Sequence, residues 1–65
     1  MSELLETLRK VHDEGTAQVI VKQMQDESPC QDCFEAMAGL IVDGTAKAWL
    51  DTQGQLVIGM AYTAN

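Results

Sequence analysis

The sequence predicts an α+β domain in which three helices are followed by a C-terminal β-hairpin. Two observations carry this prediction: apolar residues recur at helical spacing before Gly44, and they recur at every second position after it. With 65 residues the chain has room for one domain only, which covers residues 1–65. A chain this short buries only about 60% of its unfolded surface, so pairing with another chain is a common source of added stability.

The first helix is expected over residues 3–13. Ser2 is a suitable N-cap, and Gly15 follows the predicted end, where glycine commonly terminates a helix. The apolar residues at helical spacing are Leu4, Leu8 and Val11.

The next segment, residues 17–25, fits two structures. A helix from an N-cap at Thr16 is favoured by apolar residues at positions i, i+3, i+4 and i+7, which are Ala17, Ile20, Val21 and Met24. A strand is suggested by the β-branched run at residues 19–21. We predict a helix, because a strand would place Lys22 on the apolar face.

The third helix is expected to begin in the segment S-P-C-Q-D-C-F. Ser28 would be the N-cap, Pro29 the first helical residue, and Gln31 the partner of Ser28 in a capping box. The helix would end at Asp43, with Gly44 as the stop. The predicted apolar stripe consists of Cys30, Phe34, Met37 and Ile41, flanked by Cys33 and Leu40.

Beyond Gly44 the alternation predicts two strands joined by the turn D-T-Q-G. The predicted core face carries Ala46, Ala48, Leu50, Leu56, Ile58, Met60 and Tyr62. The opposite face carries Trp49, Val57 and Ala61, which we interpret as an apolar surface for a partner or for self-association. The alternative is that Trp49 packs against the first helix at the edge of the domain.

The segment A-M-A-G-L-I-V-D-G-T-A-K-A-W-L-D-T-Q-G-Q-L-V-I resembles the end of the recognition helix, the glycine stop and the two-stranded wing of a winged helix-turn-helix domain. With the preceding helices, the resemblance covers nearly the whole chain and implies a winged-helix-like fold. Winged helices bind DNA through the third helix, or bind protein. The exposed positions of that helix would be Gln31, Asp32, Glu35, Ala36 and Gly39. None is cationic, so protein binding is favoured, with Asp32 and Glu35 as further interaction residues.

The formal net charge of −6 also bears on the partner. Nucleic-acid affinity depends on lysine and arginine contacts to phosphate, and no such residue lies between Lys22 and Lys47. Nucleic acid is therefore disfavoured as a partner through the third helix. The alternative, a DNA-binding transcriptional regulator, would use the cations Arg9, Lys10, Lys22 and Lys47. No apolar run reaches the roughly 20 residues of a membrane span, and the amino-terminal charge order is not that of a secretory signal, so we expect a cytoplasmic protein without a membrane partner.

Cys30 and Cys33 form a C-x-x-C motif at a predicted helix start. We predict that both thiols face the core. Two alternatives remain open: a redox site with a thiolate stabilised by the helix N-terminus, and a metal site that includes His12. No catalytic set is visible and no cofactor is indicated, so we predict that the protein is not an enzyme. The sequence favours a small acidic regulatory or accessory protein that binds another protein. That partner could also be a second copy of the chain, which would make the protein a homodimer.

Overall fold

The computed structural model describes residues 2–60, which form three helices followed by a two-stranded antiparallel hairpin. The helices are α1 (Ser2–Arg9), α2 (Glu14–Glu27) and α3 (Gln31–Asp43), and the strands are β1 (Ala46–Leu50) and β2 (Leu56–Met60). This order confirms the predicted α+β arrangement. Within residues 2–60, no helix has the length and apolar character needed to cross a membrane.

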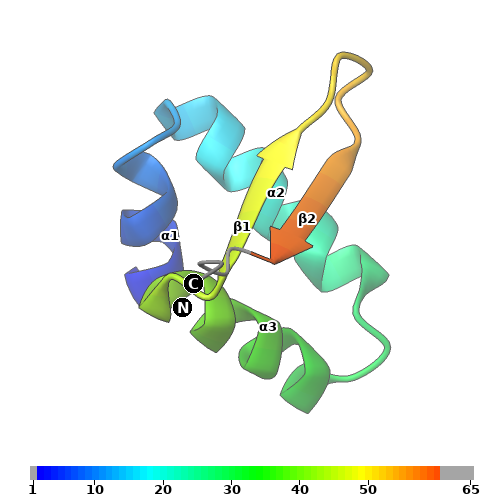
Figure 1. The fold of residues 1–65 in the computed structure, drawn as a ribbon. Coiled ribbons are helices and arrows are strands. Elements are labelled where there is room, and N and C mark those ends of the chain that lie inside the picture. The colour runs from blue at the N-terminus through cyan, green and yellow to red at the C-terminus, as the bar shows by residue number, and fades with distance from the viewer. Residues whose placement is uncertain (1, 61–65) are drawn as a thin grey trace.

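A single core joins the three helices to one face of the hairpin. Figure 1 shows α2 behind the hairpin and α3 across its base, with the turn between the strands at the far end. The buried side chains are Leu4, Leu8, Ala17, Ile20, Met24, Phe34, Ile41, Ala46 and Ala48. Ala46 and Ala48 alternate with exposed residues, so β1 turns these two small side chains toward the helices, and Leu50 on the same face packs half-buried against the core.

In the hairpin, Trp49 lies opposite Val57 and Leu50 lies opposite Leu56, so Trp49 and Val57 share a face as predicted. Both predicted glycine turns are confirmed: Gly44 ends α3 with a φ of 91°, and Gly54 lies in the hairpin turn with a φ of 79°. Glycine adopts these left-handed conformations without the steric cost that a Cβ atom imposes. Tyr62, which was predicted to extend the core face, lies outside the described residues.

The prediction that the first helix extends to Asp13 is wrong. Helix α1 ends at Arg9, and Asp13 has extended backbone angles and occupies the N-cap position of α2. Gly15 therefore lies in the first turn of α2 rather than beyond the end of α1.

Two contacts explain the early end of α1, one with the distant strand β1 and one within the turn itself. The imidazole Nε2 of His12 lies 3.0 Å from the Ala48 carbonyl oxygen in β1, which draws the segment after α1 toward the hairpin. The guanidinium of Arg9 pairs with both carboxylate oxygens of Glu14 across the turn. Neither contact can be predicted from the helical spacing of apolar residues.

Residues 17–25 are helical, so the favoured prediction is confirmed and the strand alternative is wrong. The N-cap position belongs to Asp13 and not to Thr16. Helix α2 starts at Glu14, earlier than predicted, because α1 ends earlier than predicted. Ala17, Ile20 and Met24 are buried, as their spacing predicts.

The predicted cap of the third helix is also wrong. Ser28 caps the end of α2, where its hydroxyl donates a hydrogen bond to the Met24 carbonyl at 2.6 Å. A residue before proline is driven toward extended angles, and Ser28 has φ −80° and ψ 128° because Pro29 follows it. The chain bends at Pro29 and Cys30, and Cys30, with extended backbone angles, is the N-cap residue of α3 in place of Ser28.

Candidate functional site

Two of the surface grooves in the structure are lined by residues of the predicted interaction and cysteine sites. The first, which we call the tryptophan groove, has a volume of about 420 Å³ and lies between the C-terminal ends of α1 and α3 and strand β1. Its lining residues are Thr7, Leu8, Lys10, Val11, His12, Ile41, Gly44, Ala46, Lys47, Ala48 and Trp49. It brings Trp49 of the hairpin together with the turn after α1, a segment that helical spacing predicts to be part of the first helix.

Exposed apolar side chains lie at the rim of the tryptophan groove. Val11 is 75% exposed and Trp49 is 40% exposed, although both are large apolar residues. Val11 was predicted to lie on the buried face of the first helix, and it is exposed because α1 ends before it. Large apolar side chains that stay exposed around one groove mark an interaction site more often than isolated exposed apolar residues do.

The orientation of Trp49 is set by its neighbours on the outer face of the hairpin. Val57 lies directly opposite Trp49 in the register and is half-buried. A Cβ atom at Gly59 would lie 3.1 Å from the Trp49 ring, so the absence of a side chain at Gly59 leaves room for the edge of the indole. Ala61, the third residue predicted for this face, lies outside the described residues.

Lysines border the tryptophan groove, while carboxylates do not line it. Lys10 and Lys47 are both exposed lining residues. Arg9 is neighbouring in sequence, but its guanidinium is paired with Glu14, and this hydrogen bond holds the pKa of the Glu14 carboxyl below its usual range. Lys22, the remaining predicted nucleic-acid residue, is exposed on α2 and does not line the groove.

His12 has a structural contact at the base of the tryptophan groove. Its Nε2 atom lies 3.0 Å from the Ala48 carbonyl oxygen, and it must carry the hydrogen because a carbonyl oxygen only accepts. This contact occupies a backbone acceptor on the outer edge of β1. Within residues 2–60, no group of three or more histidine, cysteine, aspartate or glutamate side chains is placed to hold a metal ion, so His12 does not join Cys30 and Cys33 in such a group.

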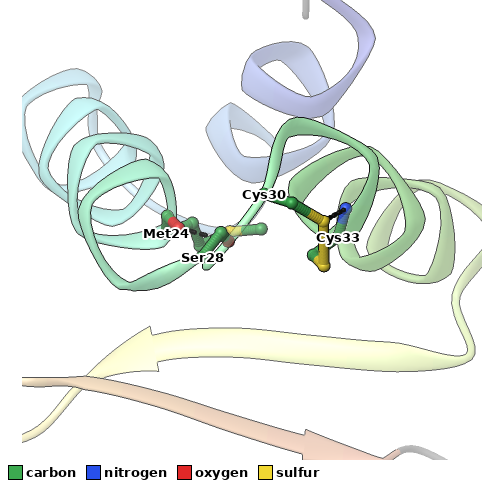
Figure 2. The surroundings of a disulfide bond; sticks show 4 residues. All are labelled: Met24, Ser28, Cys30 and Cys33. Carbon is green, nitrogen blue, oxygen red and sulfur yellow. Dashed lines mark hydrogen bonds between the residues drawn. A yellow bond between two sulfur atoms is a disulfide. The ribbon is translucent and has the colours of Figure 1, made fainter.

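The two cysteines lie at the start of α3 and are bonded to each other (Figure 2). Their Cα atoms are 5.1 Å apart, and the Sγ atom of Cys30 accepts a hydrogen bond from the Cys33 backbone N–H at 3.0 Å. Both residues are exposed, so the prediction that they face the core is wrong. Cys30 lies outside the helix as its N-cap and Cys33 is exposed in the first turn, so Phe34 is the first buried residue of the predicted stripe.

A second groove, which we call the cysteine groove, has a volume of about 240 Å³ and passes beside Cys33. It runs between the end of α2, the first half of α3 and the hairpin. Its lining residues are Met24, Glu27, Ser28, Pro29, Cys33, Met37, Leu56 and Ile58. Asp32 and Glu35 are exposed on α3 as predicted, and neither lines the cysteine groove.

Sequence reasoning missed one residue that positions the hairpin. The Gln23 side chain donates to the Gly54 carbonyl at 2.8 Å and accepts from the Leu56 N–H at 2.9 Å. These bonds tie the base of the hairpin turn to α2, and nothing in the local pattern around Gln23 distinguishes it from an exposed helical glutamine.

Comparison with known proteins finds no matching family model, no matching curated protein and no matching solved structure. The resemblance to winged helix-turn-helix domains therefore stays a prediction, and the function rests on the geometry of the two grooves.

Proposed function

We propose that this protein works by binding another protein through the tryptophan groove. The observation that supports the proposal is the exposure of Val11 and Trp49 beside a groove of about 420 Å³. Protein interfaces concentrate their binding energy in a few aromatic and apolar anchors that become dry on association. The groove offers space for one or two apolar side chains of a partner.

The charges around the groove define the partner more closely. Lys10 and Lys47 stand at its border, so the complementary ligand is a segment that carries an apolar anchor flanked by carboxylates. A second copy of the chain fits less well, because a two-fold contact would set the same lysines against each other and bring two chains of net charge −6 together. The homodimer is the alternative that the experiment separates.

Nucleic acid fits the structure less well than an acidic protein segment. The exposed side chains predicted on α3 are indeed exposed, and two of them, Asp32 and Glu35, are acidic. Of the cations in the chain, Arg9 is already paired with Glu14. Too few free cations remain on any one face to neutralise a run of phosphates.

The test compares two valine variants that differ in location. Val11→Glu places a carboxylate in the groove, where it is costly to bury and repels an acidic partner. Val19→Glu is the matched control, because Val19 is 41% exposed on α2 and does not line the groove. Proteins captured by the wild type and by Val19→Glu, but lost with Val11→Glu, are then purified and their affinities are measured by titration calorimetry.

We expect Val11→Glu to lower the affinity for the captured partner by roughly tenfold or more, and Val19→Glu to leave this affinity nearly unchanged. The charge reversals Lys10→Glu and Lys47→Glu should weaken it further, whereas Lys22→Glu should not. Equal affinities for the two valine variants would overturn the proposal. Sedimentation would instead favour the homodimer if the wild type and Val19→Glu sediment as dimers and Val11→Glu sediments as a monomer.

A further inference from the structure

We infer that Cys30 and Cys33 form a thiol–disulfide exchange site that acts on cysteines of a polypeptide. The site combines an exposed disulfide at the start of a 13-residue helix with an apolar groove beside one of its sulfur atoms. It goes beyond the proposed binding function, because none of the residues that line the tryptophan groove also line the cysteine groove.

The hydrogen bonding assigns different roles to the two sulfur atoms. Cys30 occupies the N-cap position, and its Sγ atom accepts the Cys33 N–H at 3.0 Å. A donor of this kind, together with the positive end of the helix, stabilises a thiolate relative to a thiol. Cys30 is therefore the sulfur that carries the mixed disulfide with a substrate, and Cys33 is the sulfur that leaves or resolves it.

A purely structural role explains the pair less well. The bond closes a loop with a sequence separation of 3, and the entropic stabilisation by a disulfide is smallest for the shortest loops. Both residues are exposed, so the sulfur atoms add little to the core. Exposed disulfides are also the ones that exchange most readily with external thiols.

The cysteine groove indicates the class of substrate. Beside Cys33 its walls are the apolar side chains of Met24, Met37, Leu56 and Ile58. Methionine side chains adapt to ligands of different shape, so these walls suit an apolar side chain that adjoins a substrate cysteine. The nearby charges are acidic, with Glu27 lining the groove and Asp32 between the two cysteines, and this disfavours an anionic thiol such as glutathione.

The reaction of the disulfide form consumes a polypeptide dithiol. A substrate thiolate attacks the Sγ atom of Cys30, the bond between Cys30 and Cys33 breaks, and Cys33 leaves as a thiolate. The second substrate thiolate then attacks the substrate sulfur of the mixed disulfide, and Cys30 leaves as a thiolate. The substrate loses two electrons and becomes a disulfide, the protein pair gains them, and the two thiol protons pass through solvent to Cys30 and Cys33.

The test uses the reverse direction with one cysteine removed. The probe is a synthetic peptide that contains one intramolecular disulfide, a leucine beside one cysteine, and two lysines. Reduced Cys33→Ser keeps the attacking thiol and lacks the resolving one, so it should trap the mixed disulfide at Cys30. Reduced Cys30→Ser should form its mixed disulfide roughly tenfold more slowly, as followed by mass spectrometry.

Two controls separate substrate binding from intrinsic reactivity. Met37→Gln keeps the length of the side chain but makes the groove wall polar, and we expect it to slow oxidation of the leucine dithiol peptide roughly threefold more than it slows reduction by dithiothreitol. A peptide with serine in place of leucine should lose this difference, and reduced glutathione should reduce the disulfide form more slowly than either dithiol peptide does.

Equal trapping rates for Cys30→Ser and Cys33→Ser would overturn the assignment of roles. The alkylation rate of the reduced wild type is compared with that of an unfolded cysteine peptide as a function of pH. Identical pH profiles would overturn the claim that the helix start stabilises a thiolate. Loss of the helical circular dichroism on reduction would show that the bond is a structural staple and would overturn the exchange site.

Discussion

The side chain of Gln23 joins α2 to the hairpin, and its replacement by methionine gives the sharpest test of the packing. The amide of Gln23 donates to Gly54 at 2.8 Å and accepts from Leu56 at 2.9 Å, across more than 30 residues of sequence separation. Methionine has nearly the same length and volume, so Gln23→Met removes both hydrogen bonds without leaving a cavity. The hairpin would then be held to α2 by apolar contacts alone.

The expected cost follows from the two lost bonds. A neutral hydrogen bond contributes about 1 kcal/mol net to folding, so Gln23→Met should lower the free energy of unfolding by about 2 kcal/mol. A domain of this length has a total stability of about 3–10 kcal/mol, so the loss is a large part of it. The corresponding decrease in melting temperature is roughly 8–16 °C.

The measurement is urea unfolding followed by circular dichroism and tryptophan fluorescence, with amide exchange at Leu56 as a local probe. Gln25→Met is the matched control, because Gln25 is an exposed glutamine on the same helix. We expect a lower midpoint and faster exchange for Gln23→Met only. Midpoints that agree for the two variants would show that water replaces the Gln23 contacts without cost, and the reasoning would fail.

Three other perturbations have defined outcomes. Gly44→Ala should lower the free energy of unfolding by about 1–2 kcal/mol in urea titrations, because φ at Gly44 is 91° and alanine is strained there; an unchanged midpoint would contradict this. Hydrogen bonds to Arg9 and Thr45 hold the pKa values of the Glu14 and Asp43 carboxyls below their usual range, so the stabilisation they give is complete above the unfolded pKa and is lost as the pH falls below about 4. A Glu14→Gln, Asp43→Asn double variant should therefore lose less stability than the wild type between pH 6 and pH 2.5, and equal losses would contradict this. A nonspecific DNA duplex should show no retention at physiological salt, and a micromolar complex that weakens steeply with salt would favour the DNA-binding alternative.

The order of the elements is predictable because it depends on local signals. The change from helical spacing to alternation after Gly44, and the glycine in the D-T-Q-G turn, locate the hairpin without tertiary information. The helix boundaries are less predictable, since they depend on contacts with distant parts of the chain. The end of α1 is set by His12 reaching Ala48, a contact between residues 36 positions apart.

The errors at the two candidate sites have the same origin. With the N-cap placed at Ser28, Cys30 is a helical member of the predicted apolar stripe, whereas in the structure Cys30 is itself the N-cap and both cysteines are exposed. Extending the first helix through Val11 buries that side chain in the prediction, whereas the turn exposes it. A shift of two to four residues in a helix boundary thus changes which side chains are available for binding or exchange.

The two grooves lie at opposite ends of α3, which allows their functions to be tested separately. Cys30 caps the start of this helix and Gly44 its end, so the 13 residues between them span about 20 Å at the rise of an α-helix. Val11→Glu changes one end, and Cys33→Ser changes the other. If a partner still binds the Cys33→Ser variant but no longer binds the Val11→Glu variant, binding belongs to the tryptophan groove alone. If a mixed disulfide still forms on a Val11→Glu, Cys33→Ser double variant, exchange belongs to the cysteine groove alone. If either change abolishes both activities with the helices intact, the two grooves act as one surface, because a partner residue anchored in the first would then be needed to present a cysteine to the second.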